Sequence, residues 1–397
     1  TGAPYYLGAL LVGVVVTANV ALGGMRSITF VQAFQYWLKL TALAVPVIFL
    51  LLQWQGDSRP ELAAPAGVAF SQPTTVVVEH AATLRLSDGS TVEVRRGERL
   101  EFPAGAPVPT VDNVQDGLDW LLPGDSGGDR GLFGTYSLIL ATVLGTMGLP
   151  HVLVRFYTNS DGGAARRTTL VVLGLVGMFY LFPTLYGVLG RVYTPQLLMT
   201  GRTDAVVLLL PSAALGNGTL GELLGALVAA GAFAAFLSSS SGLLTSVAGV
   251  LSTDVLGRGS VRDFRVSATL GGMVPIVLAL NVSGLDVSQV VGLAFAVAAS
   301  SFCPLLVLGI WWRGLTDVGA AAGILVGGGA AVCAVLVTVL GPPLHGWTAA
   351  LVAQPAAWTV PLAFAVMVTV SSLTRTRVPA AVGATMLRLH APDALRL

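Results

Sequence analysis

A long uncharged segment, Leu223–Thr253, lies between Glu222 and Asp254. At 1.5 Å per residue, a helix of this length exceeds the hydrocarbon core of a bilayer, so the segment predicts a membrane-spanning helix. Four consecutive serines, Ser238–Ser241, lie near its middle, where polar groups are costly unless they find partners. The segment therefore indicates a membrane fold and makes the serines its most informative residues.

The serine run borders a face of small residues. Residues at helical spacing fall on one side of the predicted helix. These residues are Ala235, Ser238, Gly242, Ser246 and Gly249. Such a face lets another backbone approach closely, and helix packing is its simplest interpretation. The alternative is that the serine hydroxyls bind an ion.

Composition extends the membrane prediction to the whole chain. Of the 397 residues, 54% are hydrophobic and 10% are charged, and the mean hydropathy is +0.79. Soluble domains carry about 25% charged residues, so we predict a polytopic membrane protein with the lipid bilayer as a partner. The formal net charge of +1 gives no basic field, so nucleic acid is not expected as a partner.

Nine membrane spans are predicted from the apolar runs. They are residues 4–22, 30–52, 134–157, 168–190, 222–254, 265–283, 288–312, 318–341 and 358–373. Arginine is concentrated in alternate connections, which places residue 1 outside and the C-terminus in the cytoplasm of a plasma (inner) membrane. The chain starts with Thr1 and enters a span almost at once, so we expect it to belong to a longer protein.

Residues 54–133 are too many and too polar for a turn between spans. Within them, Ala82–Leu86 and Thr91–Arg95 alternate in polarity around Ser-Asp-Gly-Ser. This pattern predicts a β-hairpin inside a small β-rich extracellular insert. The charges of the insert most simply mark a solvated face, and a gating lid or a partner-binding module is the alternative.

The third span carries glycine and proline near mid-membrane, which favours a broken helix. The N-terminus of a half-helix attracts an anion such as a carboxylate, although a kink that only aids packing also fits the sequence. The residues predicted to line a substrate here are Gly145, Thr146, Met147, Gly148 and His151. His151 could bind substrate, carry a proton or satisfy a freed backbone group.

No Asp or Glu lies in the middle of a predicted span. A carboxylate proton relay is thus unsupported by these residues, whereas a hard monovalent cation needs only neutral oxygens from hydroxyls and unwound carbonyls. The sequence shows no Ser/His/Asp arrangement, phosphate-binding loop or haem motif. We therefore expect neither an enzyme nor a cofactor.

Four stretches resemble the sodium/solute symporter family, and most closely its cation/acetate symporter branch. They are Gly23–Gln32, Gly145–Phe156, Val291–Ser300 with Pro304, and Trp311–Ala320. The resemblance runs from the first span to about residue 342 and leaves most of the insert outside. It implies an all-α inverted repeat of five plus five helices, with helices 1 and 6 broken.

The resemblance also implies an assignment of the spans. Residues 1–53 would be helices 4 and 5, residues 134–312 helices 6–10, and residues 313–373 two peripheral spans before a cytoplasmic tail, 374–397. The third span would be helix 6 and the serine span helix 8. Helices 1 to 3 would then lie outside the chain.

A sodium site between helices 1 and 8 follows from the same resemblance. Its helix-8 oxygens would be the carbonyl of Ala235 and the hydroxyls of Ser238 and Ser239, with helix 1 supplying the others. Gln32 occupies a position where many members have Asp, which argues for a single ion site.

The implied function is secondary active symport, in which sodium as the coupling ion drives uptake of a short monocarboxylate such as acetate. Proton coupling is an alternative, with His151 or a group outside the chain as the carrier. A sensor or a non-transporting remnant of a transporter would also fit the sequence.

Overall fold

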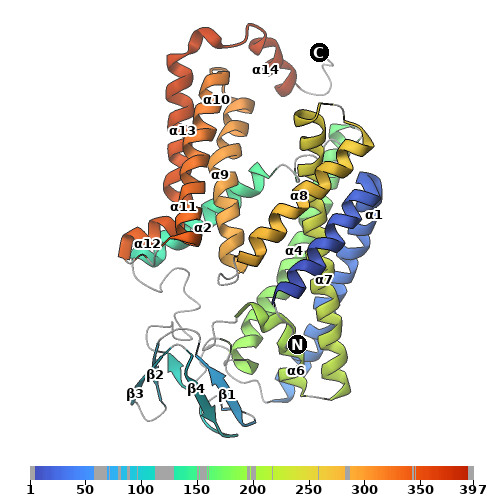
Figure 1. Ribbon diagram of the computed structural model, residues 1–397, viewed down its shortest axis with the longest axis vertical. Coiled ribbons are helices and arrows are strands. Elements are labelled where there is room, and N and C mark those ends of the chain that lie inside the picture. Colours follow the sequence, from blue (N-terminus) through green and yellow to red (C-terminus); the bar gives the residue numbers. More distant parts are fainter. Residues whose placement is uncertain are drawn as a thin grey trace. The chain divides into compact units, whose positions relative to one another are not determined.

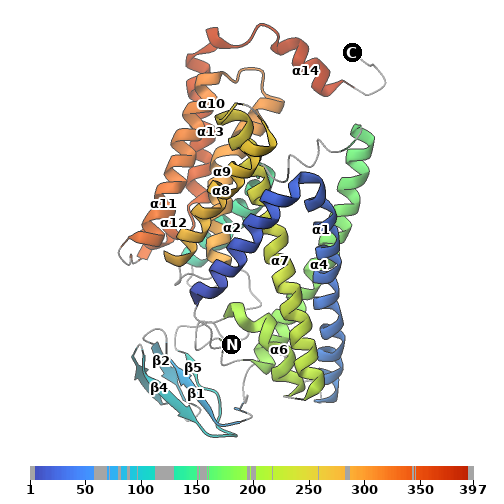
Figure 2. The same cartoon turned by 45° about the vertical axis from the view of Figure 1, so that its right-hand side comes forward.

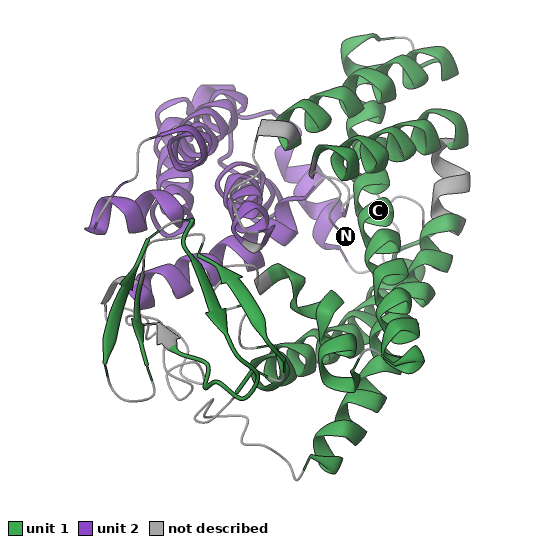
Figure 3. Cartoon of the chain, turned by 60° about the horizontal axis from the view of Figure 1, so that its bottom comes forward, with its two compact units in different colours: residues 1–122, 159–283 green, residues 123–158, 284–397 purple. Residues whose placement is uncertain are grey.

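The structure is a computed structural model dominated by long helices (Figure 1 and Figure 2). It describes residues 5–391 except 58–68, 71, 79–81, 87–89, 96, 112–128, 150–151, 153–158, 160, 195–196, 198–202, 217, 258, 282–286, 342–343 and 345. The chain forms two compact units, coloured separately in Figure 3. Unit 1 comprises residues 1–122 and 159–283, and unit 2 comprises residues 123–158 and 284–397.

Eight helical segments in the described part of the chain are long and apolar enough to cross a membrane. They are Tyr6–Gly23, Val31–Gly56, Gly131–Gly148, Gly162–Tyr193, Thr219–Val255, Gln289–Trp311, Asp317–Leu340 and Ala356–Leu373. Each overlaps a predicted span, so the chain is a polytopic helical membrane protein. The remaining predicted span, 265–283, falls on helix α8 (Val261–Asn281), which is not among these eight.

Five long or medium helices lie among the described residues of unit 1. They are α1 (Tyr5–Gly56), α4 (Gly162–Tyr193), α6 (Val206–Leu215), α7 (Thr219–Val250) and α8. A short 3-10 turn, Thr203–Ala205, precedes α6, and a π-helical turn, Leu251–Val255, extends α7. The serine span thus forms one continuous helix.

Helix α1 contains the first two predicted spans. The family resemblance of Gly23–Gln32 implies a Gly-Gly turn between them, but the backbone stays helical through Gly23 and the residues that follow. A glycine inside a helix lowers its stability by only about 1 kcal/mol relative to alanine. The helix can therefore bend at Gly23 without being interrupted. Figure 2 shows the bend, after which the second half of α1 runs in a different direction from the first.

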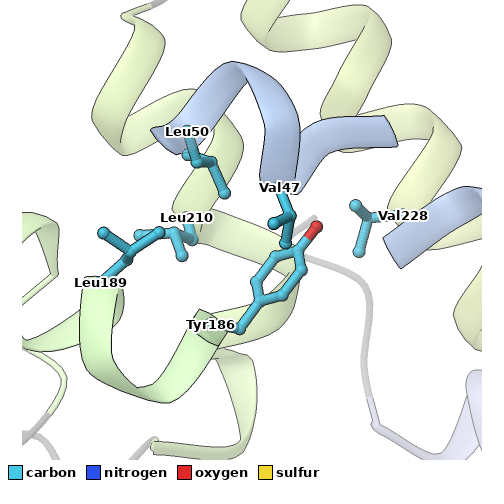
Figure 4. Packing of buried hydrophobic residues seen from close by; sticks show 6 residues of the cluster. All are labelled: Val47, Leu50, Tyr186, Leu189, Leu210 and Val228. Atoms are coloured by element: carbon cyan, nitrogen blue, oxygen red, sulfur yellow. The ribbon is translucent and has the colours of Figure 1, made fainter. Parts of the chain in front are cut away.

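The core of unit 1 joins the second half of α1 to α4, α6 and α7. Its buried side chains are Val47, Leu50, Tyr186, Leu189, Leu210 and Val228 (Figure 4). Tyr186 is fully buried, and its hydroxyl donates a long hydrogen bond of 3.5 Å to the carbonyl oxygen of Leu43. A second cluster joins the first half of α1 to α7 and α8, and its buried residues include Val16, Val20, Leu244 and Ala268.

Unit 2 is built around α9, α10 and α13, with α2 packed against α9. Its helices are α2 (Asp129–Gly148), α9 (Val287–Trp311), α10 (Asp317–Gly323), α11 (Gly329–Leu340), α12 (Gly346–Ala353), α13 (Ala356–Leu373) and α14 (Val382–His390). A π-helical turn, Ile324–Gly328, joins α10 to α11, and a 3-10 turn, Arg375–Arg377, follows α13.

Glycines at four-residue spacing bring α10 and its π-helical turn against α13. A Cβ atom at Gly319, Gly323 or Gly327 would overlap Ser371, Met367 or Ala363, respectively. Helices in a membrane gain little from burying apolar surface against one another, so close backbone packing at small residues is their main attraction.

The described part of the insert contains five short strands. Strand β1 (Thr74–Val77) pairs antiparallel with β4 (Arg99–Phe102), and a second sheet has the order β3-β2-β5. Its strands are β2 (Ala82–Arg85), β3 (Thr91–Val94) and β5 (Thr110–Val111). The antiparallel pairing of β2 with β3 confirms the predicted hairpin.

The buried cluster of Figure 4 makes a testable prediction. Leu210→Ala is expected to lower the free energy of unfolding by about 2–5 kcal/mol, because this fully buried side chain leaves a cavity. Leu209→Ala is the matched control, since Leu209 is 44% exposed on the same helix and leaves no such cavity. Thermal unfolding of the two variants in detergent checks the difference, and equal melting temperatures would contradict it.

Candidate ion and substrate sites

The serine run is positioned by close packing of α7 on the second half of α1. The two segments are antiparallel, because Gln32 lies against Ser238 whereas Ala42 lies against Gly231. A Cβ atom at Gly231 would overlap the methyl group of Ala42 and lie 3.8 Å from the Cα atom of Lys39. Glycine therefore allows the backbones to approach closely enough for a side chain of α1 to reach the main chain of α7.

The buried stripe of α7 and its face of small residues are not the same. Around the serines, the buried stripe includes Gly231, Ala234, Ser241, Thr245 and Ala248. The small face (Ala235, Ser238, Gly242, Ser246 and Gly249) is half-buried and lies beside that stripe on the helix. Packing within unit 1 thus uses the neighbouring stripe, and the small face remains partly accessible.

The predicted ion ligands lie on or beside this partly accessible face. Ala235 and Ser238 are half-buried and Ser239 is exposed. Further along α7, the hydroxyls of Thr245 and Ser246 donate to carbonyl oxygens four residues back, at 2.6 and 3.1 Å. The hydroxyls of Ser238 and Ser239 make no hydrogen bond to any residue that the structure describes.

These oxygens have the chemistry of a weak cation site. Serine hydroxyls and a backbone carbonyl are neutral oxygen ligands of the kind that hard cations accept. No acidic residue of α7 lies between Glu222 and Asp254. The site offers oxygens without a buried negative charge, which suits a monovalent ion better than a divalent one.

Two glutamines on α1 face α7 beside the serines. The side-chain amide of Gln32 donates a hydrogen bond of 2.9 Å to the backbone oxygen of Ser238. Gln35 lies about one turn further on the same face, and its buried Oε1 atom has no partner among the described residues. Both side chains are 8% exposed. Sequence reasoning noted Gln32 but overlooked Gln35, although two glutamines three residues apart in an apolar span mark a polar face.

The predicted substrate-lining residues belong to the end of α2. The helix ends at Gly148, and Leu149 is not helical, in agreement with a break at this point. Pro150 and His151 lie outside the described residues. Thr146 and Met147 are exposed, and the hydroxyl of Thr146 donates to the carbonyl oxygen of Thr142 at 2.6 Å.

The two glycines of this stretch pack against α9. A Cβ atom at Gly145 would lie 2.5 Å from the backbone oxygen of Phe295. One at Gly148 would lie 2.8 Å from the oxygen of Ala298 and 3.2 Å from the nitrogen of Cys303. The structure therefore gives both glycines a packing role.

A serine that sequence reasoning overlooked anchors the middle of α2. The hydroxyl of Ser137 is fully buried, donates to the backbone oxygen of Gln354 at 2.7 Å and accepts from the backbone nitrogen of Ala357 at 3.0 Å. Nearby in unit 2, the hydroxyls of Ser300 and Thr359 lie 2.6 Å apart and join α9 to α13. Helix α2 thus contacts the rest of unit 2 through Ser137 near its middle and through two glycines near its C-terminal end.

The two predicted sites fall in different units. Ala235, Ser238 and Ser239 lie in unit 1, and Gly145–Gly148 lies in unit 2 (Figure 3). Each group has its own geometry: open hydroxyls beside a helix interface in unit 1, and a helix end packed through glycines in unit 2.

Comparison with known proteins gives consistent matches. Residues 110–327, a little over half of the chain, match the sequence profile of the sodium:solute symporter family. A monocarboxylic acid transporter of Corynebacterium glutamicum is 29% identical over 380 residues, which are 89% of this chain and 61% of that protein. An uncharacterized symporter of Bacillus subtilis, YwcA, is 33% identical over 221 residues, or 53% of this chain and 42% of that protein. The chain spans about three fifths and two fifths of the lengths of these relatives.

The contact of α2 with α9 generates a second prediction. Gly148→Ala is expected to destabilise the protein by about 1–3 kcal/mol, because the added methyl group meets backbone atoms that cannot rotate away. Gly134→Ala on the same helix has no heavy atom within 4 Å of the new methyl group and is expected to be neutral or stabilising. Thermal unfolding measures both, and the idea fails if the two substitutions have the same effect.

Proposed function

Because the chain belongs to the sodium:solute symporter family, we propose that it couples sodium influx to the uptake of a short monocarboxylate such as acetate. The name of the Corynebacterium relative, monocarboxylic acid transporter, supports the substrate class. Membership of the family supports a sodium-coupled mechanism.

The observation that carries the sodium assignment is the state of the serine hydroxyls. Ser238 and Ser239 have no hydrogen-bond partner in the described part of the chain, and they lie on or beside a half-buried face. A hydroxyl inside a membrane span normally bonds to its own helix or to a neighbour. Oxygens without such partners are available to an ion, and the carbonyl of Ala235 would be a third ligand.

In this proposal, sodium binds at Ser238 and Ser239 while the carboxylate substrate binds near Gly145–Gly148. Coupling means that each ligand raises the affinity for the other by the same factor. The loaded protein then opens alternately to the two sides of the membrane. Sodium moves down its gradient, and the substrate is carried in with it. We place the protein in the plasma (inner) membrane, with its C-terminus in the cytoplasm, on the distribution of arginines.

The test is uptake of radiolabelled acetate by the full-length protein in vesicles, with and without an inward sodium gradient. The wild-type protein is expected to require the gradient. Ser238→Ala and Ser239→Ala are expected to raise the sodium concentration for half-maximal uptake by about tenfold or more, equivalent to about 1.4 kcal/mol of binding free energy. This rise is expected because each substitution removes one oxygen ligand of the ion.

Ser240→Ala is the matched control, because Ser240 belongs to the same run but points away from the small face. It is expected to leave the sodium dependence unchanged. Uptake that ignores sodium and both substitutions would refute the sodium assignment. Uptake that instead follows an imposed pH gradient would establish proton coupling.

A further inference from the structure

We infer that Gln32 is a positioning residue for the ion site, an inference that rests on the proposed sodium coupling. Its Nε2 atom donates a hydrogen bond of 2.9 Å to the backbone oxygen of Ser238, which is 206 residues away in sequence. An amide N–H cannot ligate a cation. Through this contact, Gln32 acts on the ion site by way of Ser238.

The contact determines which oxygen of Ser238 is free. In an α-helix, the carbonyl oxygen of Ser238 already accepts the N–H of Gly242, four residues on. A backbone carbonyl has two lone pairs, so the Gln32 amide engages the second one. The side-chain hydroxyl is then the oxygen that Ser238 can offer to an ion.

The same contact fixes the position of the serines relative to α1. The bond is shielded from water because Gln32 is only 8% exposed, and such bonds are electrostatically stronger than those in water. The backbone contact at Gly231 sets the separation of α1 and α7 about two turns away. The hydrogen bond from Gln32 fixes the separation of the two helices again at Ser238, so the serine run is held to α1 at two points.

Gln35 provides an internal control. It has the same side chain and the same exposure as Gln32, and it lies on the same face of α1. Its buried Oε1 atom, however, has no hydrogen-bond partner in the described part of the chain. A substitution there changes the polarity and volume of the interface without removing the contact to Ser238.

The experiment compares Gln32→Asn, Gln32→Met and Gln35→Asn with the wild-type full-length protein. The sodium concentration for half-maximal acetate uptake and the maximal rate are measured in vesicles, and melting temperatures are measured without sodium. Gln32→Asn keeps the amide but is one methylene short, so we expect a three- to tenfold rise in half-saturating sodium with little change in maximal rate. Gln32→Met, which has a similar length but no N–H to donate, should change in the same direction. Gln35→Asn should match the wild type.

The outcomes separate this inference from the proposed function. Wild-type uptake that is independent of sodium refutes both. Sodium-dependent wild-type uptake with equal half-saturating sodium in Gln32→Asn and Gln35→Asn refutes the positioning role alone. Unchanged half-saturating sodium in Gln32→Met also refutes it, because that variant lacks the hydrogen bond to Ser238. A lower melting temperature with unchanged half-saturating sodium assigns Gln32 a structural role only and overturns the inference.

Discussion

The approach of α7 to α1 at Gly231 is the contact on which the geometry of the serine run depends. Any side chain at this position would overlap Ala42, so the helices would have to separate. A glutamine side chain reaches only a few ångströms, and the bond from Gln32 to Ser238 requires the helix separation that Gly231 permits. The absence of a side chain at one point of the interface thus brings a polar contact into reach two turns away.

Helices of unit 2 also pack closely at glycines. Gly145 and Gly148 lay α2 on the backbone of α9, and Gly327 lies against both Ser300 of α9 and Ala363 of α13. Buried hydroxyl pairs such as Ser300 with Thr359 then tie the same helices together. Without a strong hydrophobic drive between helices in lipid, packing at glycine and hydrogen bonds between helices supply the specificity.

The sequence predicted those features that depend on local composition and spacing. Apolar length located the spans, alternation around Ser-Asp-Gly-Ser located the hairpin, and Gly148 with the following proline located the end of α2. Contacts between helices distant in sequence could not be obtained in this way. Spacing alone does not say that Gln32 reaches Ser238, or that α7 packs through the stripe beside its small face. The helical backbone at Gly23 was also missed, because glycine permits a turn without requiring one.

A neutral site has a physical advantage for a coupling ion in this setting. A carboxylate facing the serines would bind a cation more strongly, but it would leave an uncompensated charge in the membrane whenever the ion departed, and buried charges without partners are costly. Compared with a carboxylate, hydroxyl and carbonyl oxygens bind the cation less tightly, but the site without the ion is then less costly to keep in the membrane. Position then replaces charge as the means of selecting and holding the ion, because weak ligands bind well only when they are held at the right distances. A buried amide donor at Gln32 is suited to that task, since it fixes the backbone of Ser238 without adding charge.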